Sequence, residues 1–396
     1  MENHSNSLVQ LNNGITLYFR EFSTTPLAGI TFKIHLNSQE KLGLPHLIEH
    51  VLVNKIKKPD FIKLSGSTDR NAISIKMLGN SADIVNFSQY FFSKLFAFKI
   101  KKQSLRNEKA VVIQEIRQYG NSSLEKFANV ARNCSFKAHN LFDDEVLGTP
   151  KDIANFTTKD IYDFFDTHLV KDNISVLIAG TCSTLHKIKN DLNTYYLKTS
   201  SIIANDSVNY FPKETLLLEK AVIGKAEQKQ LAQLSFIYKV GSDHLDKNRI
   251  LALSMLFSLL NSGTYSLLSQ MQRFVPKLYF FQAIPIFRKT NIYLQVLTSC
   301  SIQDAEIIEN NINKVFLTLS KLNSDNLKAT IHNLKFQHNL LFDGVEKSVL
   351  SFANMSLEQE KLIDLDSIDP IFIVEKFKKI TTTLVDQAGS KVIAYM

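Results

Sequence analysis

Residues 44–53 read Leu-Pro-His-Leu-Ile-Glu-His-Val-Leu-Val, and this stretch decides the fold that we expect for the chain. Pro45 suits the first turn of a helix, because its missing N–H would have no partner inside the helix there. Residues three and four positions apart share one face of a helix, so His46, Glu49 and His50 project together. The two apolar residues between His46 and Glu49 then point toward a core. The stretch therefore predicts a helix that presents two imidazoles and one carboxylate side by side.

The spacing of these three side chains is typical of a zinc site in a peptidase. Two imidazoles one helical turn apart can ligate one Zn²⁺, and the carboxylate between them can then reach a water molecule. The order His-x-x-Glu-His inverts the common HExxH order and is the inverzincin pattern. At the His and Glu frequencies of this chain, about one such sequence in a hundred would hold the pattern by accident. The motif predicts His46 and His50 as metal ligands and Glu49 as the catalytic base.

A catalytic zinc needs a third protein ligand and one open position. Glu108 and Glu115 are seven residues apart, which returns both carboxylates to nearly the same helix face. One of them can ligate the metal while the other orients an imidazole that ligates it. On spacing alone, two solvated charges are the more frequent explanation, and the upstream motif is what favours the metal. Four apolar residues of the same stretch predict a buried stripe, namely Val111, Val112, Ile113 and Ile116.

Strand-like and helix-like stretches alternate along the chain, which predicts an α+β or an α/β fold, and of these we expect α+β. In the first half, strands are expected at 15–21, 28–36, 71–78 and 174–179, and helices at 45–53, 84–98, 105–119 and 158–167. The second half resembles the first in pattern. Leu234–Asp243 matches Ile30–Gln39 as a strand followed by a polar turn, and an apolar helix without His or Glu begins near Asn248.

The length of 396 residues favours two domains, because single hydrophobic cores stop growing near ~250–300 residues. Together with the internal repeat, the length predicts two similar α/β-sandwich domains. We expect the first domain at residues 1–199, with the metal site, and the second at residues 208–396, without one. The polar stretch at residues 200–207 is the expected linker.

The bulk composition narrows the class of protein and its surroundings. The net charge is +8, but no aromatic and basic recognition motif accompanies it, so a solvated lysine-rich surface is favoured over nucleic-acid binding. The three cysteines form no CxxC pair, which argues against a disulfide framework and a thiolate zinc site. No secretory signal is recognisable, and no apolar run approaches the ~20 residues that cross a bilayer. We therefore expect a cytoplasmic protein that binds neither nucleic acid nor membrane.

Beyond the metal motif, the first half resembles the pitrilysin or insulinase family of inverzincin peptidases. The shorter branch of that family, which includes the mitochondrial processing peptidase subunits, is the most similar. The resemblance covers about residues 8–182 and rests on Leu11–Gly14, His46–His50, Ser67–Ala72, Glu108–Glu115, Leu147–Pro150 and Lys171–Asn173. The second half is similar only in pattern, through Leu260–Gly263 and Leu278–Tyr279.

The resemblance implies a role for each residue of the expected metal site. His46, His50 and Glu115 correspond to the three zinc ligands of the family. Glu49 corresponds to the catalytic base, which takes a proton from water and delivers it to the leaving amine. Glu108 corresponds to a carboxylate that orients a ligand.

Two further residues are candidates for substrate binding. Asn71, on a strand expected to pair with an extended peptide, is expected to help hold the peptide backbone. An Asn that simply ends a turn is an equally frequent explanation. The family commonly has an Arg and a Tyr seven residues apart that bind the substrate carbonyl. Here Tyr279, which could instead be a core aromatic, has Gln272 at that offset and Arg273 one residue later. Either Arg273 replaces the missing Arg, or a partner subunit supplies the pair, and we favour the partner.

The resemblance implies a zinc metalloendopeptidase that cleaves short or unfolded peptides inside a closed chamber of four similar domains. Each chain would form half of that clamshell, either in a homodimer or with an inactive sister subunit, in a process such as peptide maturation. The alternative is a non-catalytic subunit that keeps the fold and serves as a scaffold or binds peptides. The complete ligand set argues against this alternative, and the missing Arg argues for it.

Overall fold

The computed structural model forms two compact units that are described separately. It describes residues 6–36, 41–69, 71–119, 123–136, 144–199, 216–217, 220–223, 231–242, 247–278, 280–287, 291–355, 370–387 and 389–395. The first unit comprises Met1–Gly120, Asp143–Val208 and His338–Asp364, and the second comprises Asn121–Phe142, Asn209–Gln337 and Leu365–Met396. Among the described helices, none is both long and apolar enough to span a bilayer.

The first unit is built on a six-stranded sheet with the strand order β1-β2-β6-β3-β5-β4. Its strands are β1 Asn6–Gln10, β2 Thr16–Glu21, β3 Leu27–His35, β4 Lys63–Thr68, β5 Ala72–Asn80 and β6 Ile174–Gly180. Its helices are α1 Leu44–Lys55, α2 Ser81–Phe96, α3 Lys102–Tyr119, α5 Asp144–Leu147, α6 Pro150–Asn155, α7 Thr158–His168, α8 Cys182–Leu192 and α13 Val345–Ala353. The strands and helices expected in the first half are all present, with ends that differ by a few residues. Strands β1 and β4 were not expected.

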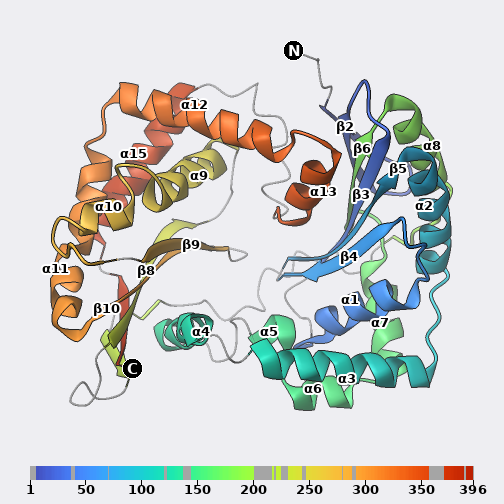
Figure 1. The fold of residues 1–396 in the computed structure, drawn as a ribbon, viewed down its shortest axis with the longest axis horizontal. Coiled ribbons are helices and arrows are strands. Elements are labelled where there is room, and N and C mark those ends of the chain that lie inside the picture. The colour runs from blue at the N-terminus through green and yellow to red at the C-terminus, as the bar shows by residue number, and fades with distance from the viewer. Residues whose placement is uncertain are drawn as a thin grey trace. The chain divides into compact units, whose positions relative to one another are not determined.

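Helices cover both faces of this sheet, and β3 shows why (Figure 1). Side chains alternate between the two faces of a strand, so Phe32 and Lys33 point in opposite directions. Phe32 faces α2, where its ring centroid lies 6.3 Å from that of Phe91 and 5.8 Å from that of Phe92. Lys33, which is fully buried, faces α13 and donates to the backbone carbonyl of Phe352 at 3.2 Å. The sheet is therefore packed on both sides.

Helix α13 joins the first sheet although it belongs to the second half of the sequence. The hydroxyl of Thr31 donates to the carbonyl of Val349 at 2.7 Å, and that of Ser74 donates to the carbonyl of Ala353 at 3.1 Å. The ammonium of Lys33 also donates to the carbonyl of Met355. The last four carbonyls of a helix have no partners inside it, so the hydrogen bonds to Phe352 and Ala353 satisfy the C-terminal end of α13.

The second unit is built on a five-stranded sheet with the strand order β7-β11-β8-β10-β9. Its strands are β7 Lys220–Ile223, β8 Leu231–Ser242, β9 Phe281–Phe287, β10 Asn291–Ser301 and β11 Ser390–Tyr395. Its helices are α4 Ser123–Ser135, α9 Lys247–Asn261, α10 Leu267–Met271, α11 Ile302–Ser320 and α15 Pro370–Asp386, and α12 spans Ser324–Leu341. Helix α15 packs against both α9 and α11, and α11 and α15 contact β8.

Helix α4 is the counterpart of α13, because it comes from the first half of the chain and packs on the second sheet. The guanidinium of Arg132 donates to the buried carboxamide oxygen of Gln295 on β10 at 2.8 Å. The amide of Gln295 in turn donates to the carbonyl of Ala128 at 3.2 Å. Both units thus consist of a sheet with helices on one face and a helix from the other half of the sequence on the opposite face.

The two units differ from the continuous domains expected at residues 1–199 and 208–396. Asn121–Phe142 belongs to the second unit, and His338–Asp364 belongs to the first. The physical reason is the hydrogen bonding of α4 and α13 to sheets far away in sequence, which local periodicity does not reveal. The expected linker at residues 200–207 lies outside the described residues.

Candidate metal centre

Helix α1 is held in place at its N-terminus by a close approach of two glycines. Gly43 precedes the helix with a positive φ of 75°, a conformation that favours glycine. A Cβ at Gly43 would lie 2.6 Å from the carbonyl oxygen of Leu147 and 2.9 Å from the Cα of Gly148. Leu47 and Ile48 are fully buried in the core, as the sequence predicted. The opposite side of α1 therefore presents the polar residues of the motif.

The structure brings the three expected ligands together. Nε2 of His46 and Nε2 of His50 are 3.2 Å apart. The Oε2 atom of Glu115, on α3, lies 3.0 Å from Nε2 of His50 and 3.7 Å from Nε2 of His46. Within the described part of the chain, these residues form the one group of His, Cys, Asp and Glu side chains whose ligand atoms all lie within 4.8 Å of one another.

These distances fit a tetrahedral zinc ion. Ligands at 2.0–2.1 Å from zinc in a tetrahedron are separated from one another by roughly 3.3 Å, and the three observed separations lie close to that value. Two imidazole nitrogens and one carboxylate oxygen are also donors that zinc prefers. Glu115 is 47% exposed at its side chain, which leaves one side of the group open to solvent. The residues present therefore fit a zinc ion with an accessible fourth position.

The protonation state of His46 also suits a metal ligand. Burial, followed by the nearby charge of His50, lowers the pKa of His46 from 6.5 to about 4. The imidazole is therefore neutral near pH 7, which is the form that ligates a metal. Its Nδ1 atom is buried and has no hydrogen-bond partner among the described residues.

Glu49 lies against strand β4, at the edge of the first sheet. The hydroxyl of Thr68 donates to Oε2 of Glu49 at 3.3 Å. A Cβ at Gly66 would lie 2.1 Å from Oε1 of Glu49, so the carboxylate occupies space that only a glycine leaves open. Burial raises the pKa of Glu49, while the charge of His50 and the hydrogen bond from Thr68 act in the opposite direction. A carboxylate with a raised pKa holds a proton more readily, which suits a general base.

Glu108, which we expected to orient a ligating imidazole, contacts Asn54 instead. Its Oε2 atom accepts a hydrogen bond from the side-chain amide of Asn54 at 2.8 Å. The reason is the helix rise of 1.5 Å per residue, which separates Glu108 from Glu115 by about 10 Å along α3. Glu108 therefore reaches the C-terminal end of α1, beyond the two imidazoles, and supports the pairing of α1 with α3.

The expectation that Asn71 lies on a strand open to a peptide is wrong. Asn71 precedes β5, and β5 is paired with β3 on one side and with β4 on the other. The backbone N–H of Asn71 donates to Oδ1 of Asp69 at 2.6 Å, and its carbonyl accepts from Leu36 at 2.7 Å. Asn71 therefore ends a turn before an interior strand, and the edge of the sheet is β4.

The second unit holds the remaining substrate-binding candidates. Tyr279 lies outside the described residues. Gln272, at the position of the family's Arg, donates from its amide to the carbonyl of Leu278 at 2.9 Å. Arg273 is exposed. Gln272 therefore closes the turn that follows α10.

Sequence reasoning missed three residues that surround Glu49. Gly66 and Thr68 lie on β4, and Lys76 on β5 acts on Glu49 through its charge and donates to the hydroxyl of Ser67 at 3.1 Å. The signal in the sequence is weak, because β4 is small and polar and lacks the alternation of a half-buried strand.

Comparisons with known proteins identify the fold. No protein-family model matches the sequence, and no curated protein is similar to it. A protease from Helicobacter pylori is similar in structure with a TM-score of 0.78 and 18% identity, over 99% of this chain and 100% of that chain. The inactive M16 peptidase domain from Pseudomonas fluorescens is also similar in structure, with a TM-score of 0.72 and 12% identity, over 98% of this chain and 97% of that chain. The periplasmic protease PqqL from Escherichia coli has a TM-score of 0.67 and 14% identity, over 99% of this chain and 46% of that chain.

Identities this low establish the fold and leave the activity open. The match to PqqL extends over about half of that protein, whereas the other two matches extend over almost the whole of both chains. The mixed sheets and flanking helices of both units agree with these structures. The chain therefore has the fold of the M16-like peptidases, which is the pitrilysin and insulinase fold.

Proposed function

We propose that the protein is a zinc-dependent endopeptidase that cleaves short or unfolded peptides. The observation that supports this most is the convergence of His46, His50 and Glu115, whose ligand atoms lie within 4.8 Å of one another. Glu49 projects from α1, the helix that also carries His46 and His50, and it contacts the edge strand β4. A neutral imidazole, a carboxylate with an open side and a half-buried base are the components that metal-assisted hydrolysis requires.

The proposed chemistry divides between the metal and the side chains. When bound, Zn²⁺ supplies the Lewis acidity that polarises the scissile carbonyl and lowers the pKa of a water toward ~7. Glu49 accepts the proton of the attacking water at its carboxylate and passes it to the leaving amine. Its raised pKa helps it to hold that proton between the two transfers. Thr68 keeps the carboxylate oriented through its hydroxyl.

Strand β4 supports the proposal of a peptide substrate. In the described part of the sheet, β4 is paired on one side by β5 and has no strand on its other side. An extended peptide can add to such an edge through main-chain hydrogen bonds, which grip the peptide largely without regard to its sequence. Gly66 and Thr68 of β4 both contact Glu49, so a peptide added to this edge would run close to the base. Roles for Asn71 and Tyr279 in substrate binding remain predictions.

The test compares zinc content and peptide cleavage in matched variants. We expect Glu49→Gln to retain stoichiometric zinc and to lose cleavage of an unstructured fluorogenic peptide. Glu115→Gln should lose zinc, because it removes one of three protein ligands. Asp163→Asn, which changes an exposed aspartate on α7 of the same unit, serves as the control and should change neither property. Cleavage that survives in Glu49→Gln, or a wild-type protein that binds no zinc in titration, would overturn the proposal.

The second candidate function is a non-catalytic subunit of a peptidase complex. It is favoured by Gln272, which stands where the family has an Arg, and by the structural match to an inactive M16 domain. This candidate predicts a wild-type chain that cleaves no peptide even when zinc is bound. Addition of a sister subunit with an Arg and a Tyr seven residues apart would then restore cleavage only in a heterodimer.

Assembly and location are part of the same proposal. We propose that two chains, identical or sister subunits, enclose the substrate, and that the assembly is cytoplasmic and acts in peptide maturation. Analytical ultracentrifugation of the purified chain tests the homodimer. A monomer that cleaves peptides at full rate would rule out a required partner.

A further inference from the structure

Strand β4 has two faces, and the proposed chemistry uses only one of them. Side chains alternate between the faces of a strand, so Ser65 and Ser67 lie on the face opposite to Gly66. Glu49 lies against Gly66 and therefore on the first face. Residues directly opposite in a pair of strands share a face, and Lys76 of β5 is paired with Ser65. Lys76 and the two serines therefore form the second face of the sheet edge.

The ammonium group of Lys76 lies over β4. Its Nζ atom donates to the hydroxyl of Ser67 at 3.1 Å, so the side chain reaches from β5 to the last strand of the described sheet. Neighbouring strands lie about 4.8 Å apart, and a peptide added to β4 would run one such spacing beyond Ser67. A glutamate or aspartate side chain of that peptide is long enough to reach the ammonium group.

The electrostatic surroundings of Lys76 favour a carboxylate. Lys76 is half-buried, and burial lowers the pKa of its ammonium group, because water solvates the charge incompletely. The charge of Glu49 acts in the opposite direction, but from the first face of β4. Among the described residues, no carboxylate forms an ion pair with Lys76, whereas Lys63 of β4 is paired with Glu346 at 3.3 Å. A carboxylate on the second face would therefore give Lys76 a direct partner.

We propose that Lys76 selects acidic peptides by binding a glutamate or aspartate side chain of the substrate. This role rests on the proposed function, because it concerns the peptide that would add to β4 beside Glu49. The main chain of the peptide pairs with β4 and sets its position, while the side chain on the second face accepts a hydrogen bond from Lys76. The net charge of +8 favours the same substrates, since a positively charged protein attracts acidic peptides.

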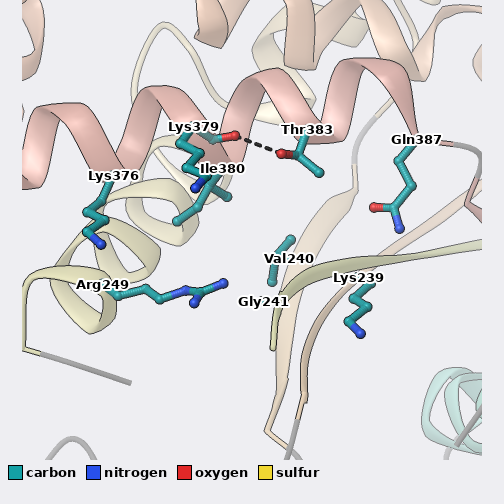
Figure 2. Close-up of a pocket in the computed structure, with 9 residues that line it drawn as sticks. All are labelled: Lys239, Val240, Gly241, Arg249, Lys376, Lys379, Ile380, Thr383 and Gln387. Carbon is teal, nitrogen blue, oxygen red and sulfur yellow. Dashed lines mark hydrogen bonds between the residues drawn. The ribbon is translucent and has the colours of Figure 1, made fainter. Parts of the chain in front are cut away.

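A cavity in the second unit is another basic surface that could attract an acidic peptide. It has a volume of about 230 Å³ and lies between the end of β8 and the helices α9 and α15 (Figure 2). Its cationic side chains are those of Lys239, Arg249, Lys376 and Lys379. Arg249 and Lys376 already interact with other residues, so we expect no contribution from this cavity. Lys379 is exposed and provides a matched control.

The experiment measures peptide binding by fluorescence anisotropy, with the full-length protein stripped of zinc so that the peptides stay intact. Three labelled, unstructured peptides are otherwise uncharged and differ at one central residue, which is Glu, Gln or Lys. We expect the wild type to bind the Glu peptide about three- to fivefold more tightly than the Gln peptide, as for a partly exposed ion pair. Lys76→Gln should bind these two peptides equally, and Lys76→Glu should prefer the Lys peptide. Lys379→Gln should keep the preference of the wild type.

Three results would overturn the role of Lys76. They are a wild type that binds the three peptides equally or not at all, a preference that persists in Lys76→Gln, and a preference that Lys379→Gln also loses. Cleavage of the same peptides by the zinc-loaded protein is measured in parallel, and its kcat/KM should follow the binding preference. A wild type that prefers the Glu peptide but cleaves none of the three contradicts the endopeptidase and not the role of Lys76. Far-ultraviolet circular dichroism checks that each variant remains folded.

Discussion

The burial of His35 predicts that the folded protein loses stability in acid, and that this loss comes from one side chain. The imidazole is only 8% exposed, and its Nε2 atom lies 2.9 Å from the hydroxyl of Ser175. Burial, and then the charge of Lys33, lower the pKa of His35 from 6.5 to about 4. The unfolded chain therefore binds a proton near pH 6.5, whereas the folded chain does so only near pH 4. Since the unfolded state binds more protons in this interval, stability must fall as the pH falls.

The size of the effect follows from the two pKa values. Each pKa unit corresponds to about 1.4 kcal/mol, so the complete loss below pH 4 is about 3 kcal/mol. Between pH 7 and pH 5, the same two values give a loss of about 2 kcal/mol in the free energy of unfolding. Above pH 7 His35 contributes almost no pH dependence, because both states are then neutral.

The assay compares wild type with His35→Gln, both stripped of metal, by urea unfolding at pH 7 and pH 5. The glutamine keeps a hydrogen-bonding group near Ser175 but cannot titrate. We expect the wild type to lose about 2 kcal/mol more than His35→Gln over this interval. His186→Gln removes an exposed histidine and serves as the control. Equal pH dependence in wild type and His35→Gln, or an NMR titration of His35 with a pKa near 6, would refute the reasoning.

Three further substitutions test the packing of the first unit. Gly43→Ala should destabilise the protein by about 1–3 kcal/mol in urea unfolding, because φ is positive and the new Cβ would lie 2.6 Å from the carbonyl of Leu147; an unchanged stability would contradict this. Asn13→Ala removes two hydrogen bonds, of 2.8 and 2.9 Å, to the backbone carbonyls of Leu192 and Tyr195, and it should lower the free energy of unfolding by about 1–3 kcal/mol. A loss below ~0.5 kcal/mol would show that these hydrogen bonds contribute little. Gly66→Ala should displace the carboxylate of Glu49 and lower peptide cleavage at least about tenfold with unchanged zinc content; full cleavage would show that Glu49 has room to move.

The metal motif could be predicted from the sequence because it is local. His46, Glu49 and His50 share a helix face as a consequence of helix geometry alone, and the structure places them on α1 as expected. Glu115 required a second helix and was reached through the seven-residue spacing and the family resemblance. The stripe expected beside it is only partly buried, since Val112 is fully buried and Val111 is 50% exposed. Val111, Val112 and Ile113 are three successive positions and span more than one face of a helix, so periodicity overestimated the buried area.

The features that could not be predicted depend on contacts distant in sequence. Strand β4 contains small and polar residues, and its place at the sheet edge is set by pairing with β5. The interior position of β5, which contradicts the open strand expected beside Asn71, depends on the same pairing. The contact of Glu108 with Asn54 depends on how α1 packs on α3. None of these relations leaves a periodic signal in one sequence.

The exchanged helices α4 and α13 have a consequence for how the chain acquires its structure during synthesis. The hydrogen bond from Thr31 to Val349 joins residues 318 positions apart, and α13 covers the polar face of β3 that includes buried Lys33. The N-terminal sheet therefore cannot reach its final packing until more than three quarters of the chain has left the ribosome. Because contacts so distant in sequence close slowly, the nascent first half must wait with one face of its sheet uncovered until α13 has been synthesised.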